Sequence, residues 1–375
     1  MMPEWPEGAW VPAEDPVLIS SSDSRRASIK SQERQPLVVT EKGKALWILA
    51  LMSPVIAEML SGSSPPREFF NPFSFMLLLG LYGAGVLLVR ELSVIWNVGW
   101  ASIIVMGAAY GILEEGVAVK SFFDPNWMDI GALGVYGRYL GTNWVWAVWL
   151  TIFHSSVSIS LPIFLSSMLF PHLRRERFLS RKRFEIVLVI LLLDVIVCTT
   201  LLNQYVPFMP MYLLAIASIF GLFMFSKHLP RGFIMPVHAA PTMSPRKFAV
   251  LGFLLLLLSL LTSAVFSESA VPFMVPVVLE FAISSAVLLV IYEHMGTTGN
   301  LPQRAYFASG MLFFFVLFGG ALLLSGWIDM IIPVVGTILF TIDLTRWSRG
   351  KRVLFFRVGK IIYGGSKARG TAASS

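Results

Sequence analysis

Apolar residues run along this chain in continuous stretches of about twenty, separated by short polar or basic segments. An α-helix of that length crosses a hydrocarbon core of roughly 30 Å. The stretches do not alternate apolar and polar residues as the strands of a membrane barrel do. They therefore predict helices, which satisfy their own backbone hydrogen bonds in lipid. We predict an all-α, polytopic transmembrane bundle of ten spans, at residues 45–61, 73–94, 98–122, 144–170, 184–205, 208–226, 248–267, 272–293, 306–327 and 329–346.

Polar segments flank this predicted bundle, which covers residues 44–347. Residues 1–43 hold too few apolar side chains for a core, so we expect a disordered cytoplasmic tail there. Residues 348–375 mix basic residues with Val, Leu, Phe and Ile. That mixture suits an amphipathic helix on anionic lipids. A solvated basic tail is the alternative for the same residues.

Composition and charge agree with an integral, multi-pass membrane protein. The chain has 375 residues, of which 56% are hydrophobic and only 14% charged. Its net charge of +7 does not indicate nucleic-acid binding, because the basic residues lie between the apolar stretches. Ten spans place every Lys and Arg on one side except Arg67, Lys120 and Arg138, which predicts an N-in, C-in topology under the positive-inside rule.

The depth of each ionisable residue follows from a rise of about 1.5 Å per residue. Glu114 and Glu115 fall about 21 Å into the third span, and His154 about 16 Å into the fourth. Buried ionisable groups usually face the bundle interior or a wet cavity. We therefore predict an outward-facing polar pocket, built from spans one, three, four and five, with the loop 123–143 as an aromatic lid. Supporting residues expected near this pocket are Glu58, Lys120, Arg138, Ser158, Asp194 and Asn203, with Glu280 at a similar depth.

The three central candidates have distinct chemical interpretations. Glu114 and Glu115 point about 100° apart on a helix, so we expect one to serve the pocket and the other to pair with Lys120 or Arg138. A buried glutamate can act as a general base, and an imidazole can relay protons or activate water. The alternatives are a headgroup-level ion pair for the glutamates and a simple hydrogen bond for His154. Thr151, His154, Ser155 and Ser158 form a polar stripe on the fourth span, and Gly107 and Gly111 on the third span allow another helix to approach closely.

A metal site is a further alternative, because Glu114, Glu115, His154 and Asp194 offer nitrogen and oxygen ligands. No two of them have the spacing of an HExxH motif. We expect no metal and no other cofactor. The substrate is left open, and the lipid bilayer is the partner that the composition indicates.

The pair Glu114-Glu115 followed by His154 on the next span resembles the intramembrane glutamic proteases that process CAAX proteins and bacteriocins. That family's EExxxR motif reads Glu114-Glu115-Gly-Val-Ala-Val-Lys120 here, with the base one place late. Its FxxxH motif has Leu150 in place of phenylalanine, and its HxxxN motif is missing. The resemblance implies a water-activating glutamate assisted by His154. Asp194 and Asn203 lie in the region of the third motif, without its histidine.

Residues 107–170 also resemble a group of multi-pass membrane proteins without an assigned activity. Two other classes compete with the hydrolase. One is a proton- or cation-coupled transporter, whose buried acids would line a central cavity. The other is a non-catalytic membrane scaffold, in which the acids would be scattered and paired separately. The distance between Glu115 and His154 separates the scaffold from the first two classes.

Overall fold

The computed structural model describes residues 40–232, 241–267, 269–295 and 300–353. Both predicted tails, apart from residues 40–43 and 348–353, lie outside this part of the chain. The described elements are α2 (Glu41–Pro54), η1 (Val55–Met59), α3 (Pro66–Phe69), α4 (Pro72–Leu78), η2 (Leu79–Gly83), α5 (Ala84–Ile95), α6 (Trp100–Gly111), η3 (Ile112–Ala118), η4 (Gly131–Gly134), β1 (Arg138–Tyr139), β2 (Thr142–Asn143), α7 (Trp144–Phe153), η5 (His154–Ser160), α8 (Leu161–Leu169), η6 (Pro171–Leu173), α9 (Arg181–Val197), η7 (Cys198–Leu202), α10 (Met209–His228), α11 (Pro245–Phe266), α12 (Met274–His294), α13 (Leu301–Leu324), η8 (Ile328–Met330) and α14 (Ile331–Ser348).

The all-α, polytopic fold is as predicted, because the described residues contain nine helices that are long and apolar enough to cross a membrane. They correspond to nine of the ten predicted spans. The predicted first span is helical as α2 and η1, but Lys42, Lys44 and Glu58 make it too charged to count with the others. Its apolar face is nevertheless packed inside, with Ala45 and Leu49 fully buried. The N-in, C-in topology stays a prediction.

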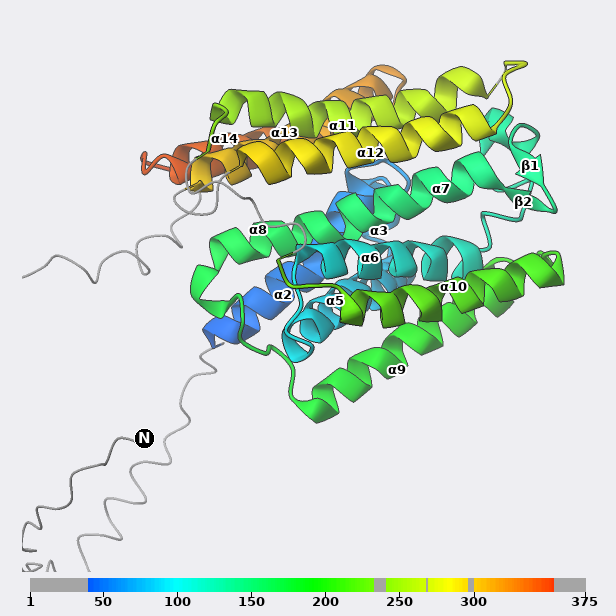
Figure 1. Cartoon of the computed structure of the whole chain (residues 1–375), viewed down its shortest axis with the longest axis horizontal. Helices are drawn as coiled ribbons and strands as arrows, with labels where there is room; N and C mark the ends of the chain where they lie inside the picture. Colours follow the sequence, from blue (N-terminus) through cyan, green and yellow to red (C-terminus); the bar gives the residue numbers. More distant parts are fainter. Residues whose placement is uncertain (1–39, 233–240, 268, 296–299, 354–375) are drawn as a thin grey trace, which may run out of the picture. The chain divides into compact units, whose positions relative to one another are not determined.

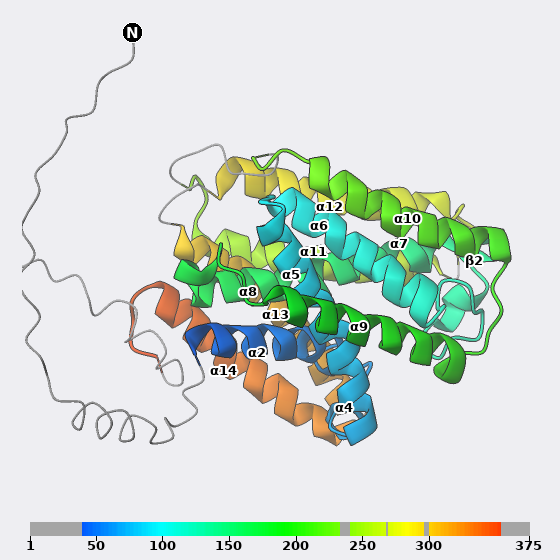
Figure 2. The same ribbon diagram turned by 90° about the horizontal axis from the view of Figure 1, so that it is seen from below.

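The helices run side by side, and the rod formed by α7, η5 and α8 lies between two groups of them (Figures 1 and 2). On one side α11, α13 and α14 pack together around a cluster of buried apolar side chains that includes Leu312 and Phe315. On the other side α5, α6, α9 and α10 enclose a second cluster that includes Met106 and Tyr110. The central rod therefore contacts both clusters.

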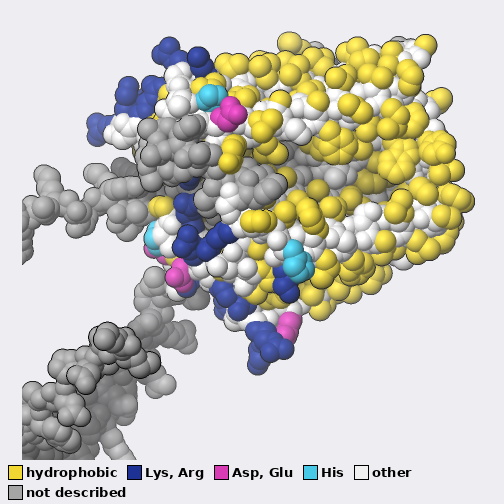
Figure 3. All heavy atoms as spheres, in the orientation of Figure 1, with side chains coloured by type: hydrophobic (Ala, Val, Ile, Leu, Met, Phe, Trp, Pro, Cys, Tyr) yellow, Lys and Arg dark blue, Asp and Glu magenta, His cyan; other side chains and the backbone are white. Residues whose placement is uncertain are grey.

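Large apolar side chains cover the outside of the bundle, as expected for a surface that faces lipid. Exposed examples include Leu193 on α9, Phe220 on α10 and Leu289 on α12. Basic side chains instead gather at one end of the bundle (Figure 3). Contacts near this end join distant segments: Lys42 pairs with Glu176 at 2.9 Å, and the Arg349 guanidinium lies 4.7 Å from the Tyr306 ring centre. This distribution agrees with the charge bias on which the predicted topology depends.

A compact loop connects η3 to α7 at the opposite end. Its hairpin pairs Arg138 with Asn143, and Leu140 and Gly141 both have positive φ angles, at 52° and 76°. Two such residues are the signature of a tight two-residue hairpin turn. Asn143 then caps α7 by accepting a hydrogen bond of 2.9 Å from the Trp146 amide. The hairpin thereby fixes where α7, and with it His154, begins.

Candidate functional site

Four π-helical segments carry the polar residues at the middle of the bundle. A π-helical turn uses i→i+5 hydrogen bonds, is rare, and is frequently found at functional sites. The bond from the Leu60 amide to the Val55 carbonyl, 2.9 Å, and the bond from the Val119 amide to the Glu114 carbonyl, 2.8 Å, have this spacing. The segments supply Glu58 on η1, Tyr82 on η2, Glu114 and Glu115 on η3, and His154 and Ser158 on η5. We call these six residues the Glu–His centre.

His154 is contacted by carboxylates at both ring nitrogens. Its Nε2 lies 2.9 Å from Glu115 Oε1, and its Nδ1 lies 3.1 Å from Glu114 Oε2. Nδ1 also lies 2.9 Å from Ser158 Oγ, one helical turn further on. An imidazolium donates from both nitrogens, whereas a neutral ring donates from only one. The geometry thus offers a carboxylate oxygen to each N–H of a protonated His154.

Glu115 is held from its other side. Ser121 donates a short hydrogen bond to Glu115 Oε2, and the Trp146 indole N–H donates to Ser121 Oγ at 3.1 Å. Trp146 is in turn positioned by the capped first turn of α7. A chain of hydrogen bonds therefore runs from the hairpin end of the bundle to the imidazole.

Glu58 reaches the centre through Tyr82. The Tyr82 hydroxyl donates a short hydrogen bond to Glu58 Oε1, and Ser64 donates to Oε2 at 2.9 Å. The Tyr82 ring centre lies 6.0 Å from the His154 ring centre. Within the described residues no Lys or Arg forms an ion pair with Glu58, Glu114 or Glu115. The centre therefore combines three carboxylates with a single imidazole.

Glycines on α6 allow the two central helices to approach this closely, as the sequence predicted. A Cβ on Gly111 would lie 2.9 Å from His154 Cβ, and one on Gly107 would lie 3.0 Å from Ser155 Cα. Such distances are too short for ordinary packing, so larger residues would push η5 away from α6. The glycine spacing thus brings His154 to the glutamates.

The expectation that only one glutamate would serve the site is wrong. Both contact His154, one at each ring nitrogen, so the two side chains can point in different directions and still reach the same imidazole. Their predicted partners lie elsewhere in the loop between η3 and α7. Lys120 donates to the carbonyls of Thr199 and Tyr205 at 2.9 and 3.0 Å, and burial lowers its pKa, an effect that nearby Asp124 opposes. Arg138 donates to the Phe123 and Gly141 carbonyls.

The other predicted supporting residues do not join the centre. Asp194 packs against Gly80, whose added Cβ would lie 1.7 Å from its Oδ2. Asn203 donates to the Val119 carbonyl at 2.7 Å and so ties the end of η7 to the loop. Glu280 accepts a short hydrogen bond from Ser259 on α11. Span five therefore contributes nothing to the centre, whereas span two contributes Tyr82.

The centre is sealed, which corrects the prediction of an open polar pocket. The exposed fractions are 3% for Glu114, 9% for Glu115 and 2% for His154. A cavity of about 620 Å³ does lie beside it, between α6, the α7–η5–α8 rod, α10 and α12, but none of these three residues lines it.

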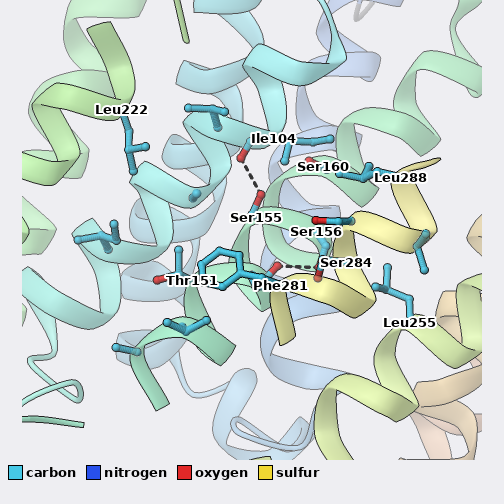
Figure 4. Close-up of a pocket in the computed structure, with 18 of the residues that line it drawn as sticks. Ile104, Thr151, Ser155, Ser156, Ser160, Leu222, Leu255, Phe281, Ser284 and Leu288 are labelled. Atoms are coloured by element: carbon cyan, nitrogen blue, oxygen red, sulfur yellow. Dashed lines mark hydrogen bonds between the residues drawn. The ribbon is translucent and has the colours of Figure 1, made fainter. Parts of the chain in front are cut away.

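The expected polar stripe is split, because Thr151 and Ser155 line the cavity (Figure 4) whereas His154 and Ser158 face the centre. Phe123, the first residue of the predicted lid, lines the same cavity together with the preceding Phe122.

A metal ion is geometrically conceivable at the centre. One ligand atom each from Glu114, Glu115 and His154 fall within 4.8 Å of one another. A mixed nitrogen and oxygen set suits several divalent transition metals. Asp194, the fourth ligand considered from the sequence, lies against Gly80 instead. A metal would bind one nitrogen of the ring, whereas the two glutamates flank both nitrogens, so the arrangement fits a proton better.

Several residues of the centre and its surroundings were not predicted from the sequence. Tyr82, Ser121 and Trp146 contact the glutamates directly or through one hydroxyl. Tyr110 is 2% exposed, and its ring centre lies 6.4 Å from that of His154. In the described part of the chain its hydroxyl has no hydrogen-bond partner, and Glu114 Oε2 accepts nothing beyond its 3.1 Å contact with His154 Nδ1. A tyrosine in an apolar stretch is a usable signal, because its hydroxyl needs a partner when buried.

Over residues 47–349 the sequence matches an uncharacterized membrane protein family, and the chain belongs to that family. The match spans the whole described bundle apart from a few residues at each end. No curated protein matches the sequence, and no solved structure matches the fold.

Proposed function

We propose that this protein is a membrane carrier whose transport step is coupled to a proton held at the Glu–His centre. The observation that carries the proposal is the position of His154. Both of its nitrogens contact glutamates, while Thr151 and Ser155 of the same helical turn line the neighbouring cavity. The ion site and the cavity thus share one helix without sharing any of the three central residues.

The charge of the centre supports proton binding. Three carboxylates and one imidazole carry a net charge of −2 if all four groups are ionised. An unbalanced charge in a low-dielectric interior costs several kcal/mol. The centre lowers this cost by taking up protons, because no Lys or Arg among the described residues neutralises it. Buried acids and histidines in membrane helices are the usual elements of proton relays.

The separation of the centre from the cavity favours coupling over direct catalysis. A general base must lie within hydrogen-bond reach, or one water, of the atom that it deprotonates. Coupling requires only that the two sites bias one shared structural element. The seam in which Gly107 and Gly111 pack against Ser155 and His154 is such an element. Protonation of the centre would change the contacts that Glu114 and Glu115 make with His154. Because His154 is part of η5, such a change would shift η5 and the cavity wall that it forms.

Transport in reconstituted vesicles tests the proposal. Wild-type protein would be inserted into liposomes that contain a pH-sensitive dye, and a panel of amphiphilic solutes would be added outside. We expect a change of internal pH with a transported solute, and no proton movement with Glu115→Gln or His154→Ala. Glu280→Gln is the matched control, because this buried acid contacts Ser259 outside the centre. Solute movement without any pH change in the wild type would refute the proposal.

A hydrolase of the glutamic type is the second candidate, and one observation favours it. The Tyr110 hydroxyl is buried beside His154 without a hydrogen-bond partner among the described residues, and Glu114 Oε2 accepts nothing there beyond its contact with His154 Nδ1. A water held by Glu114 could attack a substrate, with Tyr110 donating to the developing negative charge. Lipidated peptides incubated with the wild type would then yield cleavage products that Glu114→Gln fails to form. Unchanged cleavage by Glu114→Gln would exclude this mechanism.

A further inference from the structure

The cavity beside the Glu–His centre is long and mostly apolar. Along the α7–η5–α8 rod its wall runs from Trp144 to Phe164, twenty positions that span about 30 Å at a helical rise. That length matches the hydrocarbon thickness of a membrane. A volume of about 620 Å³ spread over such a length makes a narrow channel rather than a round chamber. Its shape therefore suits an extended alkyl chain.

Charge is confined to one end of this channel. Arg304, in the first turns of α13, is the charged residue among the described residues that line it. Its Nε is buried and has no hydrogen-bond partner within the described chain, and no acid forms an ion pair with it there. A partly buried guanidinium without an acid partner favours an anion.

We propose that the cavity binds an anionic phospholipid of the surrounding bilayer, with an acyl chain along the α7–η5–α8 wall and the phosphate at Arg304. The planar guanidinium matches phosphate oxygens in a bidentate arrangement. Arg304 lies two positions before Tyr306, whose ring contacts Arg349 near the basic end of the bundle, and that end attracts acidic lipid headgroups. A small phosphate alone would leave the apolar channel unfilled, whereas a phospholipid satisfies both the channel and the charge.

Two hydroxyl groups in the middle of the wall are already paired within the protein. Ser155 donates to the Ile104 carbonyl at 2.6 Å, and Ser156 donates to the Ile152 carbonyl at 2.8 Å (Figure 4). Their hydrogen-bonding capacity is thus used within the helices. Thr142, Ser160 and Ser284 also line the cavity, and their buried hydroxyls have no hydrogen-bond partner within the described residues. Arg304 is the charged group of the described wall that distinguishes one headgroup from another.

Native mass spectrometry of the full-length protein tests the proposal. The protein would be purified from micelles that contain equal amounts of phosphatidylglycerol and phosphatidylcholine with identical chains. We expect the wild type to retain phosphatidylglycerol preferentially. Arg304→Gln should reduce that preference roughly tenfold, because one charge-assisted interaction is lost. Val148→Trp, which fills the channel wall opposite the charge, should reduce retention of both lipids.

Two controls make the outcome decisive. Arg349→Ala removes an exposed arginine near the same end that does not line the cavity, and should leave the preference unchanged. Glu115→Gln should also retain phosphatidylglycerol, so a failure of proton coupling is distinguishable from a failure of lipid binding. An unchanged preference in Arg304→Gln, or full retention in Val148→Trp, would overturn the proposal. Displacement of the lipid by inorganic phosphate alone would also contradict it.

Discussion

Two buried ionic clusters in this bundle differ in whether basic side chains pair with their carboxylates. At the basic end, Arg90 and Glu91 on α5 pair at 2.6 Å, and Arg177 lies 3.6 Å from the same carboxylate. Glu91 also accepts from the Phe178 amide, and the Arg90 guanidinium lies 3.5 Å from the Phe178 ring centre. In the Glu–His centre, three carboxylates face one imidazole and no Lys or Arg pairs with them within the described chain.

The difference separates a structural cluster from a functional one. A buried pair whose charges balance holds its surroundings together, here by fixing the loop that contains Phe178 to α5. A buried cluster with excess negative charge is costly, and such clusters occur mainly where a protein binds protons or ions. The comparison therefore predicts opposite effects of neutralising an acid in the two places.

The largest expected effect on stability is at the balanced cluster. Glu91→Ala leaves Arg90 buried and unpaired, and should lower the free energy of unfolding by about 3–5 kcal/mol. Unfolding in mixed micelles with increasing denaturing detergent measures this. Glu185→Ala is the control, because it removes only an exposed pair with Arg181, and should cost less than about 1 kcal/mol. Equal losses in the two variants would contradict the structural assignment.

A smaller loss is expected where α6 meets η5. Gly111→Ala places a Cβ against His154 and Thr151, and should cost about 1–3 kcal/mol while abolishing coupling. Gly221→Ala on α10 meets nothing within 4 Å, and should change stability by less than about 1 kcal/mol. Thermal unfolding in detergent together with the vesicle assay checks both quantities. Retained coupling in Gly111→Ala would show that the seam does not connect the two sites.

Neutralising an acid in the Glu–His centre should cost little stability. Glu114→Gln removes one unbalanced charge and keeps a side chain of the same size, so we expect a change within about 1 kcal/mol, or a gain. Transport should nevertheless stop. The same unfolding measurement applied to Glu91→Gln and Glu114→Gln gives the sharpest contrast. A loss for Glu114→Gln as large as that for Glu91→Gln would place both clusters in the structural class.

The smallest effect concerns the exposed pair of Lys42 and Glu176. The hydrogen bond and charge of Lys42 lower the pKa of Glu176 below its usual 4.5. A lowered folded-state pKa contributes stability above pH 4.5, and that contribution is lost as the pH falls through the folded pKa. Lys42→Met should therefore flatten the dependence of stability on pH below 4.5 and leave transport unchanged. An identical pH profile in the two proteins would show that the pair contributes nothing.

The sequence predicted the fold well because the lengths of apolar runs directly reflect membrane thickness. It also indicated Glu114, Glu115 and His154, which the structure brings together. The depth of a residue in the membrane, however, does not say which way its side chain points around the helix. Asp194 and Glu280 have similar calculated depths but lie on other faces of the bundle. The direction in which a side chain points depends on packing, which periodicity alone does not give.

The π-helical segments explain why the sequence did not predict some of the contacts in the site. An i→i+5 turn shifts every following side chain around the helix axis, and such a turn has no local sequence signature of the kind that caps and turns have. η5 begins at His154 itself, so the polar stripe expected on a regular helix is divided between two sites. Tyr82 lies on another such segment and reaches Glu58 across the bundle. These contacts could be found only once the helices were assembled.

The most direct test of the central claim is the infrared absorption of protonated carboxyl groups in the purified protein at neutral pH. The excess negative charge of the Glu–His centre predicts at least one neutral carboxylic acid there. We expect its carbonyl band to be lost or shifted in Glu58→Gln, Glu114→Gln or Glu115→Gln and to be unchanged in Glu91→Gln. A spectrum in which no protonated carboxyl band responds to the three centre variants would contradict the account.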